Sequence, residues 1–180
     1  KGRNLADLSL AYGLPHFLGG LHSVDDQASR AGSGGLFAIL NADYTRIQTL
    51  PADSYLTFHI AGQATPYKLP ISEQFYIGGV DTVRGFPMSA ALGDNGYYAN
   101  LECRVAPPFL KKKKLPFAKE KTWKEVLQLV GFVDQGGVKL NGGGENQSHH
   151  ISMTGAGVGL RIFAPYVNMS FDVAFPLTGD

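Results

Sequence analysis

The chain has 180 residues, which fits one domain or a piece of a larger one. Its 16 basic and 15 acidic residues nearly balance, and this balance argues against nucleic acid as the main partner. No apolar run reaches the length of about eighteen residues that indicates a transmembrane helix, although barrel strands of about 9–11 alternating residues would give a weaker signal. The 23 glycines and the many tyrosines and phenylalanines are typical of an all-β chain with tight turns, and the single Cys103 excludes an internal disulfide framework.

Alternation of polar and apolar residues with period two predicts seven β-strands. In chain order, the predicted strands cover residues 4–14, 35–48, 54–65, 97–106, 126–134, 153–164 and 166–176. The clearest is 97–106, where Leu101 and Cys103 belong to an apolar face and Glu102 and Arg104 to a polar face. The last three strands continue this pattern, and it places Asp134, Arg161 and Asp172 on their polar faces.

The connections between these strands differ in length. Links 49–53 and 164–166 are short, whereas links 15–34, 66–96 and 135–152 are long and rich in Gly, Asn, Ser and Asp. Short turns that alternate with long loops are typical of an up-and-down outer-membrane barrel, and a compact soluble domain rarely has three such loops. We therefore favour an antiparallel transmembrane β-barrel.

One link breaks this rule. Residues 107–125 should form a short turn but contain the run Lys111–Lys114, which we interpret as a solvated charged turn. A soluble, lipocalin-like binding module remains the alternative fold. It predicts that the face of Leu101 and Cys103 is a buried core and that the face of Glu102 is in water, the reverse of a membrane barrel.

The most informative segment is 75–86, which places one arginine in a glycine-rich loop between two predicted strands. A loop in water does not need two glycines, a valine and the aromatic residues Phe75 and Phe86 around a single charge. We expect this loop to fold back into a confined polar lumen, with the glycines allowing close backbone approach to the wall. The residues of the loop motif are Gly78, Gly79, Val83, Arg84, Gly85 and Phe86.

A second motif follows in the strand 126–134, where Phe132, Asp134 and Gly136 stand in a Phe-x-Asp-x-Gly pattern. Together with Val83-Arg84-Gly85-Phe86, the stretch 93–96 and the tail segments 155–161 and 171–177, this pattern resembles the C-terminal barrel of two-partner secretion transporters. These are the haemolysin activation/secretion type, within the superfamily of outer-membrane barrel-assembly proteins. The resemblance covers roughly residues 54–177.

The resemblance implies an integral outer-membrane barrel of about sixteen strands, preceded by periplasmic POTRA domains, that exports a large partner protein without ATP. Residues 1–180 would be the C-terminal portion of that barrel domain, without its upstream strands, POTRA domains and final strand. The resemblance also implies that the arginine of the loop meets the aspartate of the wall motif, which here pairs Arg84 with Asp134. The implied partners are the secreted polypeptide and outer-membrane lipid, with no nucleic acid, no small-molecule substrate and no cofactor.

The residues themselves support this pairing, because alternation puts Asp134 and Glu102 on the same polar face. A guanidinium can bind a carboxylate through two parallel hydrogen bonds, which fixes a loop better than a lysine could. The other charges predicted to line the lumen are Glu102, Arg104, Arg161 and Asp172. Glu102 and Arg104 could form a catalytic pair, but charges that keep a channel hydrated are the better interpretation.

Other patterns do not predict chemistry. The alternating Gly155, Gly157 and Gly159 lie within a strand and do not open a helix, so we reject a phosphate-binding loop. His149 and His150 could ligate a metal with Glu145, but their Gly-, Asn- and Ser-rich loop favours solvated histidines and no metal site. No serine–histidine–aspartate arrangement has motif support, and we predict that the chain is not an enzyme.

Three further functions stay open. A barrel-assembly insertase, which folds other outer-membrane proteins, would share both motifs with the transporter. A barrel could also anchor a surface-exposed protein or enzyme encoded upstream. The third is the soluble binding module described above.

Overall fold

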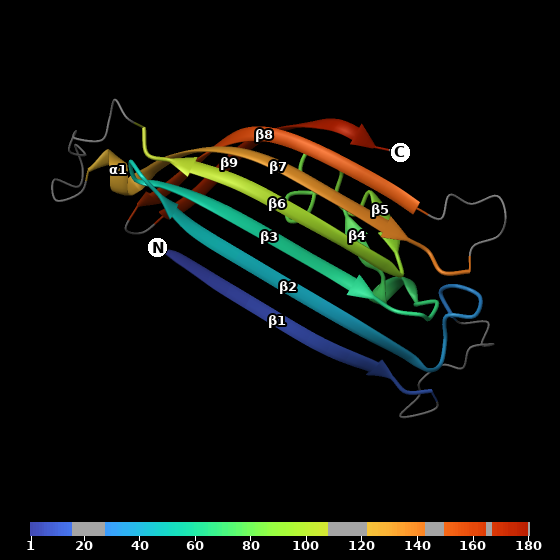
Figure 1. Ribbon diagram of the computed structural model, residues 1–180. Helices are drawn as coiled ribbons and strands as arrows, with labels where there is room; N and C mark the ends of the chain where they lie inside the picture. Colours follow the sequence, from blue (N-terminus) through green and yellow to red (C-terminus); the bar gives the residue numbers. More distant parts are fainter. Residues whose placement is uncertain (16–27, 108–121, 143–149, 165–166, 180) are drawn as a thin grey trace.

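A computed structural model describes residues 1–15, 28–107, 122–142, 150–164 and 167–179 of the chain (Figure 1). Its main feature is one sheet of seven strands, and every neighbouring pair in the order β1-β2-β3-β6-β7-β8-β9 is antiparallel. The strands are β1 (Gly2–Gly13), β2 (Phe37–Leu50), β3 (Ser54–Ala64), β6 (Asn95–Val105), β7 (Leu127–Lys139), β8 (His150–Ala164) and β9 (Val167–Gly179). The prediction of an all-β, antiparallel barrel portion with seven strands is confirmed.

The strands predicted from the sequence agree with those of the structure, and the largest difference is at the end of β7. Residues 135–139 were predicted to begin a long loop, but they extend β7 and pair with β6 on one side and β8 on the other. The glycine-rich composition of these residues suggested a loop, yet here Gly136 leaves room for Ile77 and Val83 of a segment packed against the sheet. The connection from β7 to β8 is therefore 140–149, shorter than predicted.

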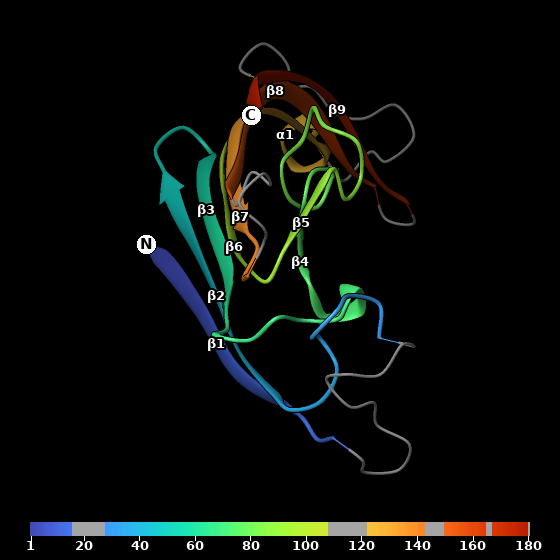
Figure 2. The same cartoon turned by 90° about the vertical axis from the view of Figure 1, so that its right-hand side faces the viewer.

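The long connection from β3 to β6 is also more ordered than predicted. It contains the 3-10 helix η1 (Ile71–Glu73) and a small hairpin of β4 (Phe75–Ile77) and β5 (Ala91–Gly93). Figure 2 shows this hairpin on the concave side of the curved sheet, which we call the inner face. The short helix α1 (Trp123–Val126) precedes β7. The lysine run 111–114, Glu145 and His149 lie outside the described residues.

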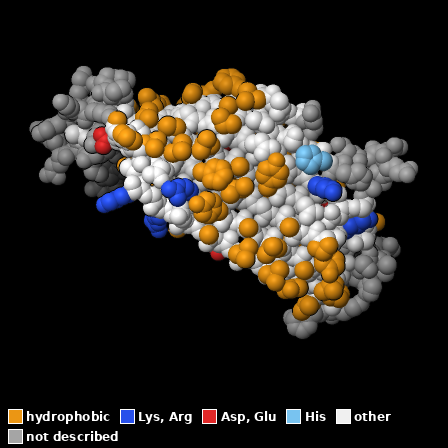
Figure 3. All heavy atoms as spheres, in the orientation of Figure 1, with side chains coloured by type: hydrophobic (Ala, Val, Ile, Leu, Met, Phe, Trp, Pro, Cys, Tyr) orange, Lys and Arg blue, Asp and Glu red, His pale blue; other side chains and the backbone are white. Residues whose placement is uncertain are grey.

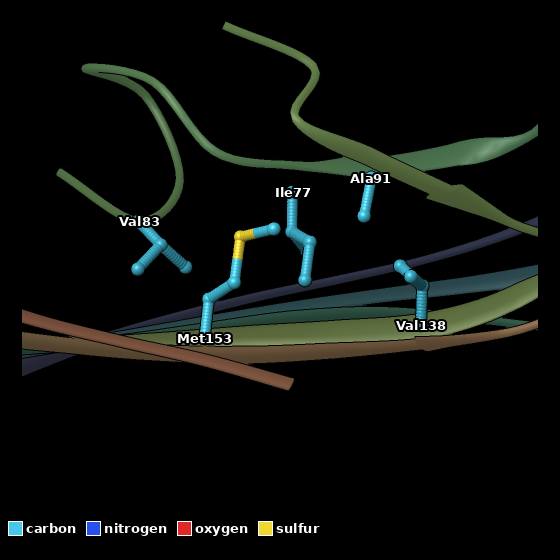
Figure 4. Close-up of a cluster of buried hydrophobic side chains, with 5 residues drawn as sticks. All are labelled: Ile77, Val83, Ala91, Val138 and Met153. Atoms are coloured by element: carbon cyan, nitrogen blue, oxygen red, sulfur yellow. The ribbon is translucent and has the colours of Figure 1, made fainter. Parts of the chain in front are cut away.

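A small hydrophobic cluster joins the hairpin connection to the inner face. Ile77, Val83 and Ala91 point down from the connection, and Val138 and Met153 point up from β7 and β8 (Figure 4). All five side chains are buried. Apolar contact therefore holds the connection against the sheet next to the site described below.

The other face of the sheet, which we call the outer face, carries exposed apolar side chains. Leu101 is 43% exposed and Phe171 63% exposed, whereas Glu102, on the inner face, is 8% exposed. Figure 3 shows hydrophobic side chains spread over the strands on this face, with few charged ones among them. This exposure is the reverse of that predicted for a soluble barrel with a core under Leu101. Among the described residues, no helix is long and apolar enough to cross a membrane.

Candidate functional site: a loop arginine held on the strand wall

The loop that carries the arginine turns back on itself through glycines. Gly78, Gly79 and Gly85 have φ angles of 100°, 103° and 97°, in the left-handed region that favours glycine. The backbone N–H of Gly79 donates to the carbonyl of Val83 at 3.2 Å, and this bond closes the turn. Val83 is fully buried in the hydrophobic cluster, and Phe86 packs against the same cluster. These contacts bring the intervening arginine to the inner face.

Arg84 binds Asp134 on β7 through three hydrogen bonds. Its Nε donates to Oδ2 at 2.6 Å and its Nη2 to Oδ1 at 2.8 Å, which is the bidentate fork geometry. The backbone N–H of Arg84 donates to the same Oδ2 at 3.1 Å. Asp134 is completely buried, and a buried carboxylate is stable in a fold only when it is paired and hydrogen-bonded. The structure thus brings together the two residues that the sequence motifs suggested.

Two more groups surround the guanidinium. Nη1 of Arg84 donates to Oε1 of Glu102 at 2.6 Å, and the ring of Phe132 lies 3.5 Å from the guanidinium carbon. A cation over an aromatic face is attracted by the ring quadrupole. Burial alone would lower the pKa of Arg84, but the hydrogen bonds and charges of Asp134 and Glu102 raise it above its ordinary value. Arg84 is therefore a permanent cation in this site.

The remaining predicted charges join the same cluster. Arg104 donates two bonds to Oε2 of Glu102, at 2.9 and 2.7 Å. Arg161 binds both oxygens of Asp172, at 2.6 and 3.0 Å, and approaches Glu102 at 3.4 Å. Asp172 also lies 3.6 Å from Arg84. Three arginines therefore face three carboxylates, and the cluster, drawn from the loop and from β6 to β9, has no formal net charge.

The Phe-x-Asp-x-Gly motif gains a physical explanation, because its three residues lie on one face of β7. Phe132 supplies the ring under the guanidinium and Asp134 its counter-charge. A Cβ atom added at Gly136 would lie 2.9 Å from a methyl carbon of Val83 and 3.1 Å from the carbonyl oxygen of Tyr97. A side chain there would push the loop off the wall. Phe75 and Phe86, which were expected around the charge, both pack against the hydrophobic cluster.

Sequence reasoning missed two contributors to the site. Asn100 donates from Nδ2 to the carbonyl of Thr82 at 2.6 Å and to Oδ1 of Asp134 at 2.8 Å, so it ties the loop backbone to the wall carboxylate. Gly155 leaves space for the backbone of Arg84. The sequence feature that could have identified Asn100 is its position between Tyr98 and Glu102 on the polar face of its strand.

The site borders a polar cavity of about 510 Å³ on the inner face. Its lining includes Thr57, His59, Asp81 and Ser170 as well as the charged cluster. Within the described residues, no group of histidine, cysteine and acidic side chains could hold a metal ion. Every carboxylate of the cluster is already bonded to an arginine, which suits an anchoring role better than proton transfer.

Comparison with protein families identifies a match over residues 3–162 to the family of the haemolysin secretion/activation proteins ShlB, FhaC and HecB. The chain belongs to this family. Membership agrees with the resemblance noted in the loop and wall motifs, both of which lie within the matched residues. Comparison with curated protein sequences gives no significant match.

Two solved structures are similar to this member of the ShlB/FhaC/HecB family. CdiB from Escherichia coli matches with a TM-score of 0.71 and 21% sequence identity, over 99% of this chain and 30% of that one. CdiB from Acinetobacter baumannii matches with a TM-score of 0.60 and 25% identity, over 81% of this chain and 25% of that one. The chain thus spans less than a third of the length of either structure, and the likeness supports the barrel fold.

Proposed function

We propose that this chain is part of an outer-membrane pore that exports a large partner polypeptide by two-partner secretion. Family membership supports the type of protein, and the outward apolar face fits an integral position in the outer membrane. Lipid would contact residues such as Leu101 and Phe171, while the charged cluster would face the lumen. The chain would have no catalytic activity, cofactor, nucleic-acid partner or small-molecule substrate.

The observation that carries this proposal is the bidentate contact between Arg84 and Asp134 on the inner face. A loop that packs against the wall of a barrel narrows the lumen, and a charge-assisted pair fixes its position. The loop would hold the pore in a defined state and position the partner during export. We call this contact the Arg84–Asp134 lock.

The test uses the full-length protein in cells that also produce the large polypeptide encoded next to it. Arg84→Ala and Asp134→Asn should reduce the amount of partner in the medium, while the barrel remains present and keeps its heat-modifiable gel mobility. Arg46→Ala is a matched control, because Arg46 is an exposed arginine on β2 that bonds to Asn4 and Gln48 away from the site. It should secrete as the wild type does.

Other outcomes would contradict the proposal. Unchanged secretion in both variants would show that the lock has no role in export. If secretion persists but other outer-membrane proteins fail to assemble, the protein is an insertase, which shares both motifs. A protein that retains its surface-exposed partner without releasing it would instead act as an anchor.

A further inference from the structure

A second buried carboxylate lies in the connection between β3 and β6, which also carries Arg84. Asp94, between β5 and β6, is fully buried. Its Oδ1 accepts hydrogen bonds from Nη1 of Arg30 at 2.6 Å and from the backbone N–H of Leu69 at 2.9 Å, and its Oδ2 accepts one from the N–H of Asn141 at 2.6 Å. A buried carboxylate is tolerated only when it is paired and hydrogen-bonded, and Asp94 meets both conditions.

These three donors, which make the shortest of its hydrogen bonds, come from three different connections of the sheet. Arg30 lies between β1 and β2, Leu69 between β3 and the hairpin, and Asn141 between β7 and β8. Nη1 of Arg30 also donates to the carbonyl of Leu69 at 3.0 Å, so two of these connections bind each other directly. Asp94 therefore joins segments that are distant in sequence and that share no strand pairing at this point.

Two asparagines extend the junction. Nδ2 of Asn141 donates to the carbonyls of Thr65 and Tyr67, at 3.0 and 2.8 Å. Asn95 donates to the side chain of Asn141 at 2.9 Å and accepts from the N–H of Thr65 at 2.8 Å. Polar side chains thus provide hydrogen-bond partners for the backbone N–H and carbonyl groups of segments that leave the sheet. The Arg30–Asp94 pair is the only ion pair that the described residues of this junction form.

The junction lies at the end of the sheet with the long connections (Figure 1). Figure 2 shows segments 28–36 and 65–74 extending from this end toward the side that carries the hairpin. In an outer-membrane barrel the long loops are on the cell-surface side. The joined segments therefore lie across the surface end of the proposed lumen, while Arg84 holds the same connection deeper inside.

We propose that the Arg30–Asp94 pair is a second lock, which holds three surface connections together across the pore and restricts its outer end. This inference rests on the proposed pore function. The two locks share no residue, although both act on the connection between β3 and β6. Release of the second lock alone would therefore widen the outer end of the pore while the Arg84–Asp134 lock stays closed, and full opening would require both to be released.

The test measures single-channel conductance of the full-length protein in planar lipid bilayers. Arg30→Ala and Asp94→Asn should each shift the recordings to larger and longer openings. Arg30→Lys keeps the cation and should stay close to the wild type. Glu73→Gln is a matched control in the same connection, because the Glu73 side chain is exposed and only its backbone carbonyl takes part in a bond to Gln63. Heat-modifiable mobility verifies that each barrel is folded.

The outcomes separate this inference from the proposed function. If the wild-type protein forms no channels, the pore function itself is wrong. If it forms channels but Arg30→Ala matches the wild type, the second lock is wrong. Should Asp94→Asn fail to fold, the comparison of Arg30→Ala with Arg30→Lys still decides the question, because the Arg30 side chain is 22% exposed and tolerates substitution more readily.

Discussion

The backbone carbonyl of Arg84 lies directly over the α-carbon of Gly155, so close that a methyl group on Gly155 would overlap the carbonyl oxygen. The neighbouring Gly85 approaches the backbone of Phe175 and Pro176 in the same way, with distances of 2.9 and 3.0 Å from an added Cβ. The loop therefore rests on the backbones of β8 and β9 as well as on the side chains of β7. Its position depends on the absence of side chains as much as on the charges.

We expect Gly155→Ala to displace the loop without removing any charge. Overpacking costs about 1–3 kcal/mol, and the loop can avoid it by leaving the wall. A nitroxide label at Val80→Cys, in a background with Cys103→Ser, should become more mobile in the electron paramagnetic resonance spectrum of the full-length protein. Gly131→Ala is the control, because nothing lies within 4 Å of a Cβ added there. Equal label mobility in both variants would contradict this account.

Arg84→Ala should lower the free energy of unfolding by about 3 kcal/mol, the lower end of the range for a broken buried pair, because the adjoining cavity is polar and accessible to water. Arg84→Lys should recover only part of this loss, since an ammonium cannot form the fork with Asp134 or stack on Phe132 as a planar group does. Urea titration of the protein refolded in lipid vesicles measures both values. Full recovery by lysine would show that charge alone matters.

The stability that the junction around Asp94 contributes should decrease in acid, because it depends on the Asp94 carboxylate. Burial alone would raise the pKa of Asp94, but the hydrogen bonds from Arg30, Asn141, Leu69 and Gln74 hold it below its ordinary value. Its contribution to stability is therefore complete above the unfolded pKa of about 3.9 and is lost as the pH falls through the lower folded pKa. The difference in unfolding free energy between wild type and Asp94→Asn should be constant near neutral pH and shrink below about pH 4. A difference that does not change with pH would mean that Asp94 is uncharged in the fold.

Leu101→Arg tests the outer face. If this face contacts lipid, an arginine near the bilayer midplane should cost about 2–4 kcal/mol of folding free energy in vesicles. Thr57→Arg places the same side chain on the inner face, where Thr57 lines the polar cavity, and should cost less. Similar losses for the two variants in urea titrations would argue against an outer face in lipid.

Much of the fold could be predicted because alternation is a local property of the sequence. Glu102, Asp134, Arg161 and Asp172 lie on the inner face, as their positions in the alternating pattern require. The pairing of Arg84 with Asp134 needed the resemblance to a family as well, since no local rule says which carboxylate a loop will reach. With that addition, the centre of the site was predictable.

The remaining features depend on contacts between distant segments. The Gly-Asp-Asn-Gly stretch at 93–96 has the composition of a turn, yet Asp94 is the centre of the surface junction and its partner Arg30 is 64 residues away. The glycines at the end of β7 were similarly ambiguous, because a glycine that makes room for a loop looks the same in sequence as one that ends a strand. Only the registers of β6, β7 and β8 reveal the difference.

The balance of three arginines and three carboxylates on the inner wall includes Arg84, which belongs to the loop and not to a strand. When the loop leaves, the strands alone carry two arginines and three carboxylates, so the wall gains one excess negative charge. In the proposed pore, a neutral surface would thus become an acidic one once the loop has left the wall. A basic side chain of a passing chain could then occupy, for a moment, the place that Arg84 has left.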